Sequence, residues 1–276
     1  MDEVAIGTAV RTAGDTGTAL VRVDGVRLGY WVGDAFHTAV GHATFDVRPR
    51  EKMIVIGPSG CGKSTLLKAI AGFIAPVGGS ITVAGRKTLA PGPDRAVVFQ
   101  EFDQLFPWRT VIDNVAYPLR VNGRSRRSAK ETAREFLELT HLGHAADRYP
   151  HQLSGGMKQR VAIARALALE PALLLMDEPF GSLDQITRQR LQRELLRMLE
   201  QTRVTLLLVT HSIDEALVLG DRVVVLAGSP SRIADVEDVT TIRGADSEDY
   251  AEKRIRLSRL LVSDAPDEDG GDDGLD

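Results

Sequence analysis

The sequence is almost without cysteine, and none of its apolar runs approaches the roughly 18 residues that a membrane-spanning helix needs. Cys61 is the single cysteine among 276 residues, so no disulfide can form within the chain and a reducing compartment is expected. A net charge of −4 gives no overall basic field, which argues against a nucleic-acid partner. The opening Met1-Asp2-Glu3 lacks the positive flank and apolar core of a secretory signal, so none is expected.

The composition that remains is typical of a soluble globular protein. Hydrophobic residues make up 43% of the chain and charged residues 26%. A chain of 276 residues allows one large domain or two small ones, and it can bury a substantial core.

Continuous apolar runs predict strands that are covered on both faces, as in a parallel sheet. Helical patterns lie between several of these runs, so an α/β fold with a mostly parallel sheet is expected. Two further runs, near Ala19–Asp24 and Ser80–Val83, alternate better and predict an antiparallel flank. The continuous runs are Met53–Ile56, Ala96–Phe99, Leu173–Met176, Val204–Val209 and Val223–Leu226.

The pattern changes between Gln100 and about Leu153, where we find no convincing strand. Residues 126–139 predict a helix, with Ser125 or Ser128 as its N-cap. We expect a helical subdomain, about 101–160, inserted into a main domain that spans 19–245. Residues 1–18 are predicted to be a flexible extension. Residues 246–276 are predicted to form a helical segment over 246–262 and an acidic, solubilising tail.

A glycine-rich loop is the most informative stretch of the chain. It fits the pattern G-x-x-x-x-G-K-[ST] between the run Met53–Ile56 and a helical pattern. Glycines let backbone N–H groups converge on phosphate oxygens, and the following helix adds the positive end of its dipole. The loop predicts nucleoside triphosphate binding, and a simple glycine-rich turn is the alternative. Its residues are Gly57, Pro58, Ser59, Gly60, Cys61, Gly62, Lys63, Ser64 and Thr65.

Within this loop, Lys63 is predicted to reach the β- and γ-phosphates and Ser64 to bind Mg²⁺. Cys61 fills a variable position, and we interpret it as a small space-filling residue. A second group lies where the apolar run Leu173–Met176 ends in Asp177 and Glu178. Asp177 is a candidate Mg²⁺ ligand, and Glu178 is a candidate to address a water that attacks the γ-phosphate. A solvated strand end is the alternative for this pair.

Residues 153–160 read LSGGMKQR and predict a second helix N-terminus that can receive an anion. Ser154, Gly155 and Gly156 precede a helix that is expected to run to about Leu169. A protein with one triphosphate site has no evident need of two such ends. An ordinary serine N-cap is the alternative when this segment is taken alone.

Taken in order, these motifs resemble the ATP-binding subunits of ABC transporters over about Ala19 to Ala245. The set is completed by Gln100 as the Q-loop glutamine, residues 181–184 (GSLD) as the D-loop, and His211 as the switch histidine. The resemblance implies a P-loop NTPase fold of the RecA-like kind. It also implies a head-to-tail homodimer that holds two ATP molecules between one phosphate loop and the partner's signature segment.

The family's roles carry over at matching positions. Lys63, Glu178, His211 and Gln100 are the expected catalytic residues, and Ser64, Gln100 and Asp177 the expected Mg²⁺ ligands. Ser154, Gly155, Gly156 and Gln159 are expected to bind the nucleotide from the signature segment. Tyr30 is expected to stack on adenine, with Trp31 and Phe36 as neighbouring alternatives.

The chain departs from the family pattern at three positions. Arg50 precedes Glu51 where a glycine is usual, Gly181 replaces the commoner serine of the D-loop, and Ser212 replaces the commoner aspartate after the histidine. None of these changes removes a catalytic group, so activity is expected to survive them.

The resemblance also implies partners. A motor without a membrane span must dock on separate transmembrane permease subunits, at the cytoplasmic face of the cell membrane, and an extracytoplasmic solute-binding protein would supply the cargo. The docking groove is expected to include the apolar residues Phe102, Leu105, Phe106, Pro107 and Trp108.

Three segments, 105–111, 176–184 and 210–217, resemble the branch that imports nitrate, sulfonate or taurine. They do not identify the solute or the permease. The alternative is an ABC-type ATPase without a transport role, in DNA maintenance or regulation. A short insertion, a single phosphate loop and a single signature argue against that alternative.

Overall fold

The computed structural model describes residues 19–87, 90–100, 104–242 and 248–262. The expected extension over 1–18 and the acidic tail beyond 262 lie outside the described residues, as does Phe102. Across the described ranges, no helix combines the length and the apolar character that crossing a bilayer requires.

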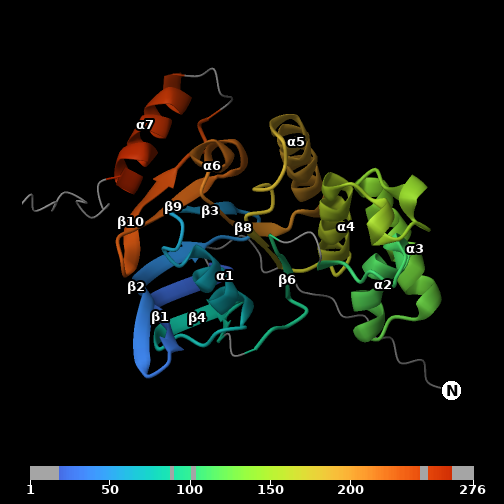
Figure 1. Cartoon of the computed structure of the whole chain (residues 1–276), viewed down its shortest axis with the longest axis horizontal. Helices are drawn as coiled ribbons and strands as arrows, with labels where there is room; N and C mark the ends of the chain where they lie inside the picture. The colour runs from blue at the N-terminus through green and yellow to red at the C-terminus, as the bar shows by residue number, and fades with distance from the viewer. Residues whose placement is uncertain (1–18, 88–89, 101–103, 243–247, 263–276) are drawn as a thin grey trace, which may run out of the picture.

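One curled sheet of ten strands organises the fold, in the order β5-β4-β1-β2-β10-β9-β3-β8-β7-β6 (Figure 1). The strands β9, β3, β8, β7 and β6 run parallel to their neighbours in this series, whereas β1 pairs antiparallel with β2 and β4. The mostly parallel core with an antiparallel flank is therefore confirmed. The strands span Val21–Val32 (β1), Ala35–Val47 (β2), Lys52–Ile56 (β3), Gly78–Val83 (β4), Arg86–Lys87 (β5), Arg95–Val98 (β6), Leu173–Asp177 (β7), Thr205–Thr210 (β8), Arg222–Ala227 (β9) and Ser231–Asp238 (β10).

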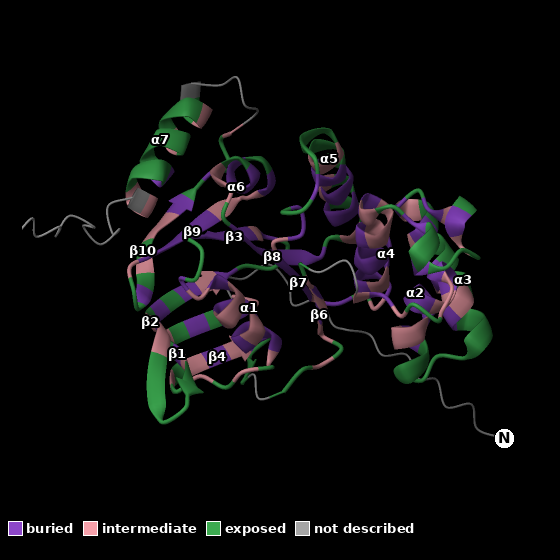
Figure 2. Ribbon diagram, in the orientation of Figure 1, coloured by how far each residue is buried: buried purple, intermediate pink, exposed green. Residues whose placement is uncertain are grey.

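Continuous apolar runs occur because the core strands have helices on both faces. In β3, Ile54 and Ile56 join one hydrophobic cluster while Met53 and Val55 join the other. The same alternation divides β7, β8 and β9 between the two clusters. Figure 2 shows these strands buried along their length, in contrast to the exposed stretches of β1 and β2. Side chains on opposite faces of a strand thus meet two apolar layers.

The helices divide between these two layers. Helix α1 lies between the core strands and the antiparallel flank, in contact with β4, β6, β7 and β8. Helices α4, α6 and α7 cover the other face, against β6, β3 and β9 respectively. The helices span Lys63–Ala71 (α1), Val111–Val121 (α2), Arg126–Leu139 (α3), Gly155–Leu167 (α4), Gln185–Thr202 (α5), Ile213–Leu219 (α6) and Glu248–Val262 (α7), with short 3₁₀ turns at Gly143–Ala145 (η2) and Pro150–Gln152 (η3).

Between β6 and β7 the chain builds helices, and residues 104–172 of the described chain contain no strand. Helices α2, α3 and α4 pack on one another at the end of the sheet (Figure 1). The helix predicted over 126–139 has those bounds, and the Ser125 hydroxyl accepts a hydrogen bond from the Ser128 N–H at 3.2 Å. Ser125 is therefore the N-cap. Treating this insertion as a separate subdomain with bounds near 101 and 160 stays a prediction.

Besides the two-residue β5, two strands are absent from the sequence-based expectation. The first, β2, is half exposed and mixes apolar residues with His37, Thr38, Gly41 and His42. The second, β10, carries four charged residues among eight. Both strands are stabilised by pairing with neighbouring strands. A hydrophobic pattern within one segment cannot reveal such pairing, so neither strand was predicted.

Arg50, which stands where the family usually has glycine, adopts a backbone conformation that favours glycine. Its backbone has a φ of 65°, in the left-handed region that favours glycine. The Arg50 N–H donates to the Thr205 hydroxyl at 2.8 Å, across the turn into β3, and this hydrogen bond helps to hold the strained conformation. Arginine therefore occupies a position that glycine would fill without steric cost.

Parallel pairing brings four chain segments to one edge of the sheet. Strands β3, β8, β7 and β6 are adjacent and parallel, so the residues that follow them all leave from the same side. The phosphate loop follows β3, His211 follows β8, Glu178 follows β7, and Gln100 lies two residues beyond β6. This edge is where ligands bind in open α/β sheets.

Candidate active site

The loop between β3 and α1 has a backbone that only glycine accommodates easily. Gly60 and Gly62 have φ values of 80° and 94°. A Cβ at Gly62 would lie 2.9 Å from Val40 Cγ2, so close packing against β2 also excludes a side chain there. Cys61 is buried at 8% exposure, which confirms its interpretation as a space-filling residue. Pro58, Ser59 and Gly60 are exposed and form the open rim of the loop.

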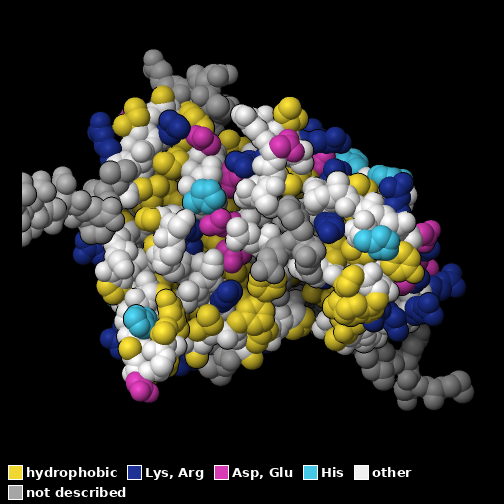
Figure 3. Space-filling model, in the orientation of Figure 1, with side chains coloured by type: hydrophobic (Ala, Val, Ile, Leu, Met, Phe, Trp, Pro, Cys, Tyr) yellow, Lys and Arg dark blue, Asp and Glu magenta, His cyan; other side chains and the backbone are white. Residues whose placement is uncertain are grey.

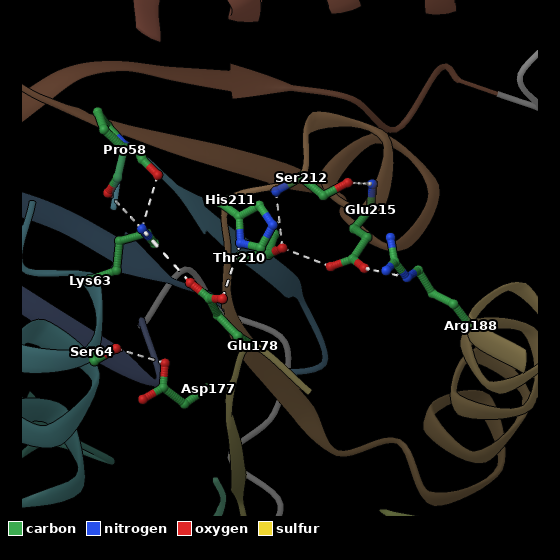
Figure 4. A network of polar contacts seen from close by, with 11 residues as sticks. Pro58, Lys63, Ser64, Asp177, Glu178, Arg188, Thr210, His211, Ser212 and Glu215 are labelled. Atoms are coloured by element: carbon green, nitrogen blue, oxygen red, sulfur yellow. Dashed lines mark hydrogen bonds and ion pairs between the residues drawn. The ribbon is translucent and has the colours of Figure 1, made fainter. Parts of the chain in front are cut away.

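The Lys63 ammonium is held inside this loop. Nζ donates to the carbonyl oxygens of Gly57 at 2.9 Å and Pro58 at 2.8 Å, and it lies 4.0 Å from Glu178 Oε1 (Figure 4). The side chain is 4% exposed. The structure therefore places a buried positive charge between the loop and the end of β7.

Ser64 and Asp177 meet across the same gap. The Ser64 hydroxyl donates to Asp177 Oδ1 at 2.8 Å (Figure 4). Burial raises the pKa of the Asp177 carboxyl, the Ser64 hydrogen bond offsets part of that rise, and the Glu178 charge adds to it. Hydroxyl and carboxylate oxygens are hard ligands of the kind that Mg²⁺ takes, so this pair fits the ion. In the part of the chain that is described, no cluster of three or more His, Cys, Asp and Glu side chains could hold a metal by itself.

Glu178 and His211 form a direct pair. His211 Nδ1 lies 3.0 Å from Glu178 Oε2, and the His211 side chain is 55% exposed (Figure 4). Glu178 has a φ of 41°, and its N–H donates to Val209 O at 3.0 Å. A left-handed residue directly after a strand is strained, and the carboxylate of this strained residue contacts the histidine.

Gln100 approaches the same carboxylate through Gly181. A Cβ added at Gly181 would lie 3.7 Å from Glu178 Oε2 and 3.8 Å from Gln100 Nε2. The exposed glutamine thus borders the Glu178–His211 pair, as expected for a residue that follows β6. These are ordinary van der Waals distances, so the Cβ of the commoner serine would also fit at this position.

The start of α4 is available to a ligand from outside. Ser154 is exposed, and its hydroxyl accepts a hydrogen bond from the Met157 N–H at 3.4 Å. Gly156 packs closely on α5, since a Cβ there would lie 3.1 Å from Thr187 Cγ2. Both glycines lie in the first turn of the helix.

Gln159 does not share this exposure. It is 0% exposed, and neither atom of its amide has a hydrogen-bond partner. On a helix, position 159 is five residues beyond the cap and turns toward the core. The expectation that Gln159 binds the nucleotide is therefore corrected, because the side chain offers no atom to an external ligand.

Three aromatic residues lie on the hairpin between β1 and β2. Tyr30 is 55% exposed, Trp31 69% and Phe36 37%. Tyr30 stacks on His37 with ring centroids 6.0 Å apart, and Trp31 meets Phe36 edge to face at 5.3 Å. All three remain candidates to stack on a base, and Tyr30 stays the predicted one.

Sequence reasoning missed a buried polar group behind His211. Thr210 and Glu215 are 2% and 4% exposed, and the Thr210 hydroxyl donates to Glu215 Oε2 at 2.7 Å. Arg188 Nε lies 3.9 Å from Glu215 Oε1 (Figure 4). A charged residue on the first turn of a short helix reads as solvated, so no signal in the sequence marked this carboxylate as buried.

The sheet order and the loop after β3 define the fold of a P-loop NTPase. The sequence model of the ABC transporter family matches residues 40–181. An ABC transporter ATP-binding protein of Methanocaldococcus jannaschii is 44% identical over 225 residues, which cover 81% of this chain and 84% of that protein. The chain belongs to the ABC transporter family of ATP-binding proteins.

Other relatives carry names of import systems. The taurine import ATP-binding protein TauB of Rhizobium johnstonii is 48% identical over 237 residues, covering 82% of this chain and 89% of that protein. The nitrate import ATP-binding protein NrtC of Synechococcus elongatus is 49% identical over 201 residues. The match covers 72% of this chain but only 30% of NrtC, so the chain spans less than a third of that relative.

Solved structures agree with the fold. The dimeric post-hydrolysis state of the ATP-binding cassette MJ0796, bound to ADP and Pi, has a TM-score of 0.70 and 32% identity, and covers 81% of this chain and 99% of that one. The structure of cbiO1 from Clostridium perfringens, part of the ABC transporter complex cbiONQ, has a TM-score of 0.73 and 26% identity, covering 89% and 96%.

The raised pKa of Asp177 gives a stability prediction of unusual sign. Because the fold disfavours the charged carboxylate, its ionisation at neutral pH lowers the free energy of unfolding, and this loss shrinks as pH falls through the folded-state pKa. Asp177→Asn removes the charge and keeps an acceptor for Ser64. We therefore expect the ligand-free melting midpoint at pH 7.5 to rise. Thermal unfolding without ligand measures this rise. The same measurement with ATP, with and without Mg²⁺, should show that the variant has lost the Mg²⁺-dependent part of the stabilisation by ATP.

Asp184→Asn is the matched control. Asp184 is exposed, and hydrogen bonds from Thr187 hold its pKa below the ordinary value, so ionisation at Asp184 favours the fold. The control should show no increase in midpoint. A lower midpoint for Asp177→Asn would contradict the proposed cost of that charge.

Proposed function

We propose that this chain is the ATP-hydrolysing motor of an ABC importer, which dimerises around two ATP molecules and drives separate transmembrane permease subunits. The single observation that carries the proposal is the gathering of Lys63, Asp177, Glu178 and His211 at one edge of the sheet. Family membership supports ATP as the nucleotide.

The proposed binding roles follow from the geometry of the loop. Backbone N–H groups of residues 57–65 would hold the phosphates, with the buried Lys63 ammonium as the counter-charge. Ser64, Asp177 and Gln100 would hold Mg²⁺ together. Of these three residues, Gln100 is the most exposed. When bound, the ion neutralises charge that develops on the β- and γ-phosphate oxygens.

The proposed chemistry falls to Glu178. Its carboxylate has one oxygen near Lys63 and the other on His211, so both oxygens are oriented before a substrate arrives. In this arrangement Glu178 would position and polarise the attacking water, and His211 would hold Glu178 and contact the γ-phosphate. Gln100, beside Gly181, would sense both the site and the helical insertion.

The second helix N-terminus supports a dimer in the proposal. Residues 154–156 begin α4, which packs on α2, α3 and β6, and the cap of this helix is exposed. An exposed helix N-terminus suits an anion brought by another molecule. The dimeric structure that resembles this chain, a cassette bound to ADP and Pi, supports a partner copy as the source of that anion.

Similarity to named import proteins supports the direction and class of transport. The relatives are ATP-binding subunits for taurine, nitrate and bicarbonate import. On this basis the chain would work at the cytoplasmic face of the cell membrane, with an extracytoplasmic solute-binding protein as an indirect partner. The proposed cargo is a small anionic or zwitterionic solute of that kind.

A cleft of about 300 Å³ supports docking of the permease. It lies between the end of α1, β6 and the insertion, and its lining is mostly apolar. Phe106 lines it beside Arg165, and Trp108 is 71% exposed with its ring 5.6 Å from Phe106. Leu105, expected in the groove wall, is instead 4% exposed and belongs to the core. Figure 3 shows hydrophobic side chains gathered over α2 and the adjoining surface toward β6.

Glu178→Gln tests the ATPase assignment. Glutamine keeps the shape of the side chain but cannot polarise water, so turnover should fall by roughly 10²-fold or more while ATP still binds. Phosphate release measures turnover, and size-exclusion chromatography with light scattering measures the dimers that should accumulate with ATP. Glu170→Gln, an exposed carboxylate after α4, is the control. Unchanged turnover in Glu178→Gln would remove Glu178 from the chemistry.

Ser154→Arg tests whether α4 acts on a partner's nucleotide. A bulky cation at the exposed cap should prevent dimer closure and leave nucleotide binding by the single chain within about twofold. Titration with a fluorescent ATP analogue measures binding, and light scattering measures closure. The control is Ser128→Arg, at an exposed serine of α3. Loss of binding by the monomer would place Ser154 in its own chain's site instead.

Trp108→Ala tests the docking surface. Because the ring is largely exposed, its removal should leave the melting midpoint within about 2 °C and reduce the fraction recovered with membranes from the source cells by several-fold. Trp108 does not line the cleft itself but contacts Phe106, which does, and Val121→Ala, at 66% exposure in the same insertion, is the matched control. Equal membrane recovery for the two variants would argue against docking at this cleft.

A further inference from the structure

The switch histidine is placed by a very short helix. Helix α6 has seven residues, Ile213–Leu219, and begins two residues after His211, with Ser212 as its N-cap. Any shift of the first turn of α6 therefore moves His211 relative to Glu178. The groups that fix this turn are positioned to control the 3.0 Å contact between the two side chains.

A closed set of hydrogen bonds fixes the turn from inside. The Thr210 hydroxyl donates to Glu215 Oε2 at 2.7 Å and accepts from the Ser212 N–H at 3.1 Å, and the Glu215 N–H donates to the Ser212 hydroxyl at 3.2 Å. Thr210 and Ser212 flank His211 in the chain, and Glu215 contacts both of them from α6 (Figure 4). Glu215 thus holds the turn through one carboxylate oxygen and its own N–H.

The other carboxylate oxygen faces a different element. Arg188 Nε, on the first turns of α5, lies 3.9 Å from Glu215 Oε1, where the glutamate side chain is 5% exposed. The same guanidinium donates from Nη2 to Leu183 O at 3.0 Å. Leu183 belongs to the segment 181–184 that connects Glu178 to α5. Arg188 therefore joins the segment after Glu178 to the helix after His211.

Glu215 is the buried member of this ion pair, with a side chain 5% exposed, whereas the Arg188 side chain is 34% exposed. Arg188 Nε is buried without a hydrogen-bond partner in the described structure, and the pKa of Glu215 is raised by burial, with Thr210 and Arg188 partly offsetting it. Exposed pairs contribute little, whereas loss of the Arg188 guanidinium would leave the buried Glu215 carboxylate without its counter-charge. By contrast, the contacts that α7 makes to the outer side of this turn, from Tyr250 and Arg254 to Asp214, are exposed.

We propose that Arg188 and Glu215 are positioning residues that hold the Glu178 segment and the His211 segment at a fixed separation. The inference rests on the proposed ATPase function and adds a link between the segment 181–184 and the switch histidine. A displacement of residues 181–184 would reach His211 through Leu183 O, the guanidinium and the Glu215 carboxylate. Neither residue touches the reacting atoms.

The test is a double-mutant cycle on the full chain with Mg²⁺ and ATP. Arg188→Gln and Glu215→Gln should each lower kcat about tenfold with KM for ATP changed less than twofold, because the catalytic pair is misplaced while the phosphate loop is intact. The double variant should be no slower than the single variants, since both remove one interaction. Arg188→Lys should be intermediate, because one ammonium cannot replace the fork that spans both partners.

A readout at His211 separates positioning from general stability. Long-range ¹H–¹⁵N NMR of the His211 ring should show a changed Nδ1 signal in Glu215→Gln at temperatures well below its melting midpoint. Arg193→Gln is the matched control, since Arg193 lies on α5, is exposed and donates to a backbone carbonyl, Gln189 O, at 3.3 Å. It should match the unchanged chain in kcat and in the His211 signal.

The outcomes separate this inference from the function on which it rests. Normal kcat in Arg188→Gln and Glu215→Gln, or effects that add in the double variant, would overturn the positioning role while ATP hydrolysis stands. A loss of kcat together with an unaltered His211 signal would also overturn it. Absence of hydrolysis in the unchanged chain would overturn the proposed function and the inference together.

Discussion

Parallel pairing of β3, β8 and β7 is the constraint on which the rest of the molecule depends. It aligns three strand ends at one edge and so brings together residues 63, 177 and 211, which are far apart in the sequence. The two apolar layers that cover these strands fix the alignment, because each strand contributes side chains to both. A register slip in any of them would exchange the two faces and would move Asp177 away from Ser64. Packing therefore decides the distances of the polar groups.

The parallel core could be predicted because its physical cause lies within each segment. Strands with helices on both faces must be apolar throughout, and the runs at 53–56, 173–176 and 204–209 have that character. The phosphate loop could also be predicted, because local backbone geometry requires its glycines and phosphate binding requires the charge of Lys63. Ser125, one of the two predicted N-caps for residues 126–139, is the observed cap, and capping also operates within three residues of sequence.

What escaped prediction depends on partners distant in the chain. The strands β2 and β10 are stabilised by pairing with their neighbours. Their polar and charged residues interrupt the apolar pattern from which strands were predicted. Gln159 was assigned from its motif, yet the direction in which α4 packs turns it inward. Arg188, Thr210 and Glu215 come from three elements, and only the assembled fold reveals that they meet. The aromatic hairpin stayed ambiguous because three exposed rings compete within seven residues.

The Lys63 ammonium already has two oxygen partners in its own loop. An arriving phosphate therefore exchanges contacts with Gly57 and Pro58, and the carbonyls released must find water or other donors. Part of the attraction between cation and anion is cancelled by this exchange, so the net affinity is smaller than the charges alone suggest. The same partners are in place to receive the ammonium again when the anion departs. A phosphate loop whose carbonyl groups take back the Lys63 ammonium favours release of the bound anion. An ATPase needs that release after each round of hydrolysis.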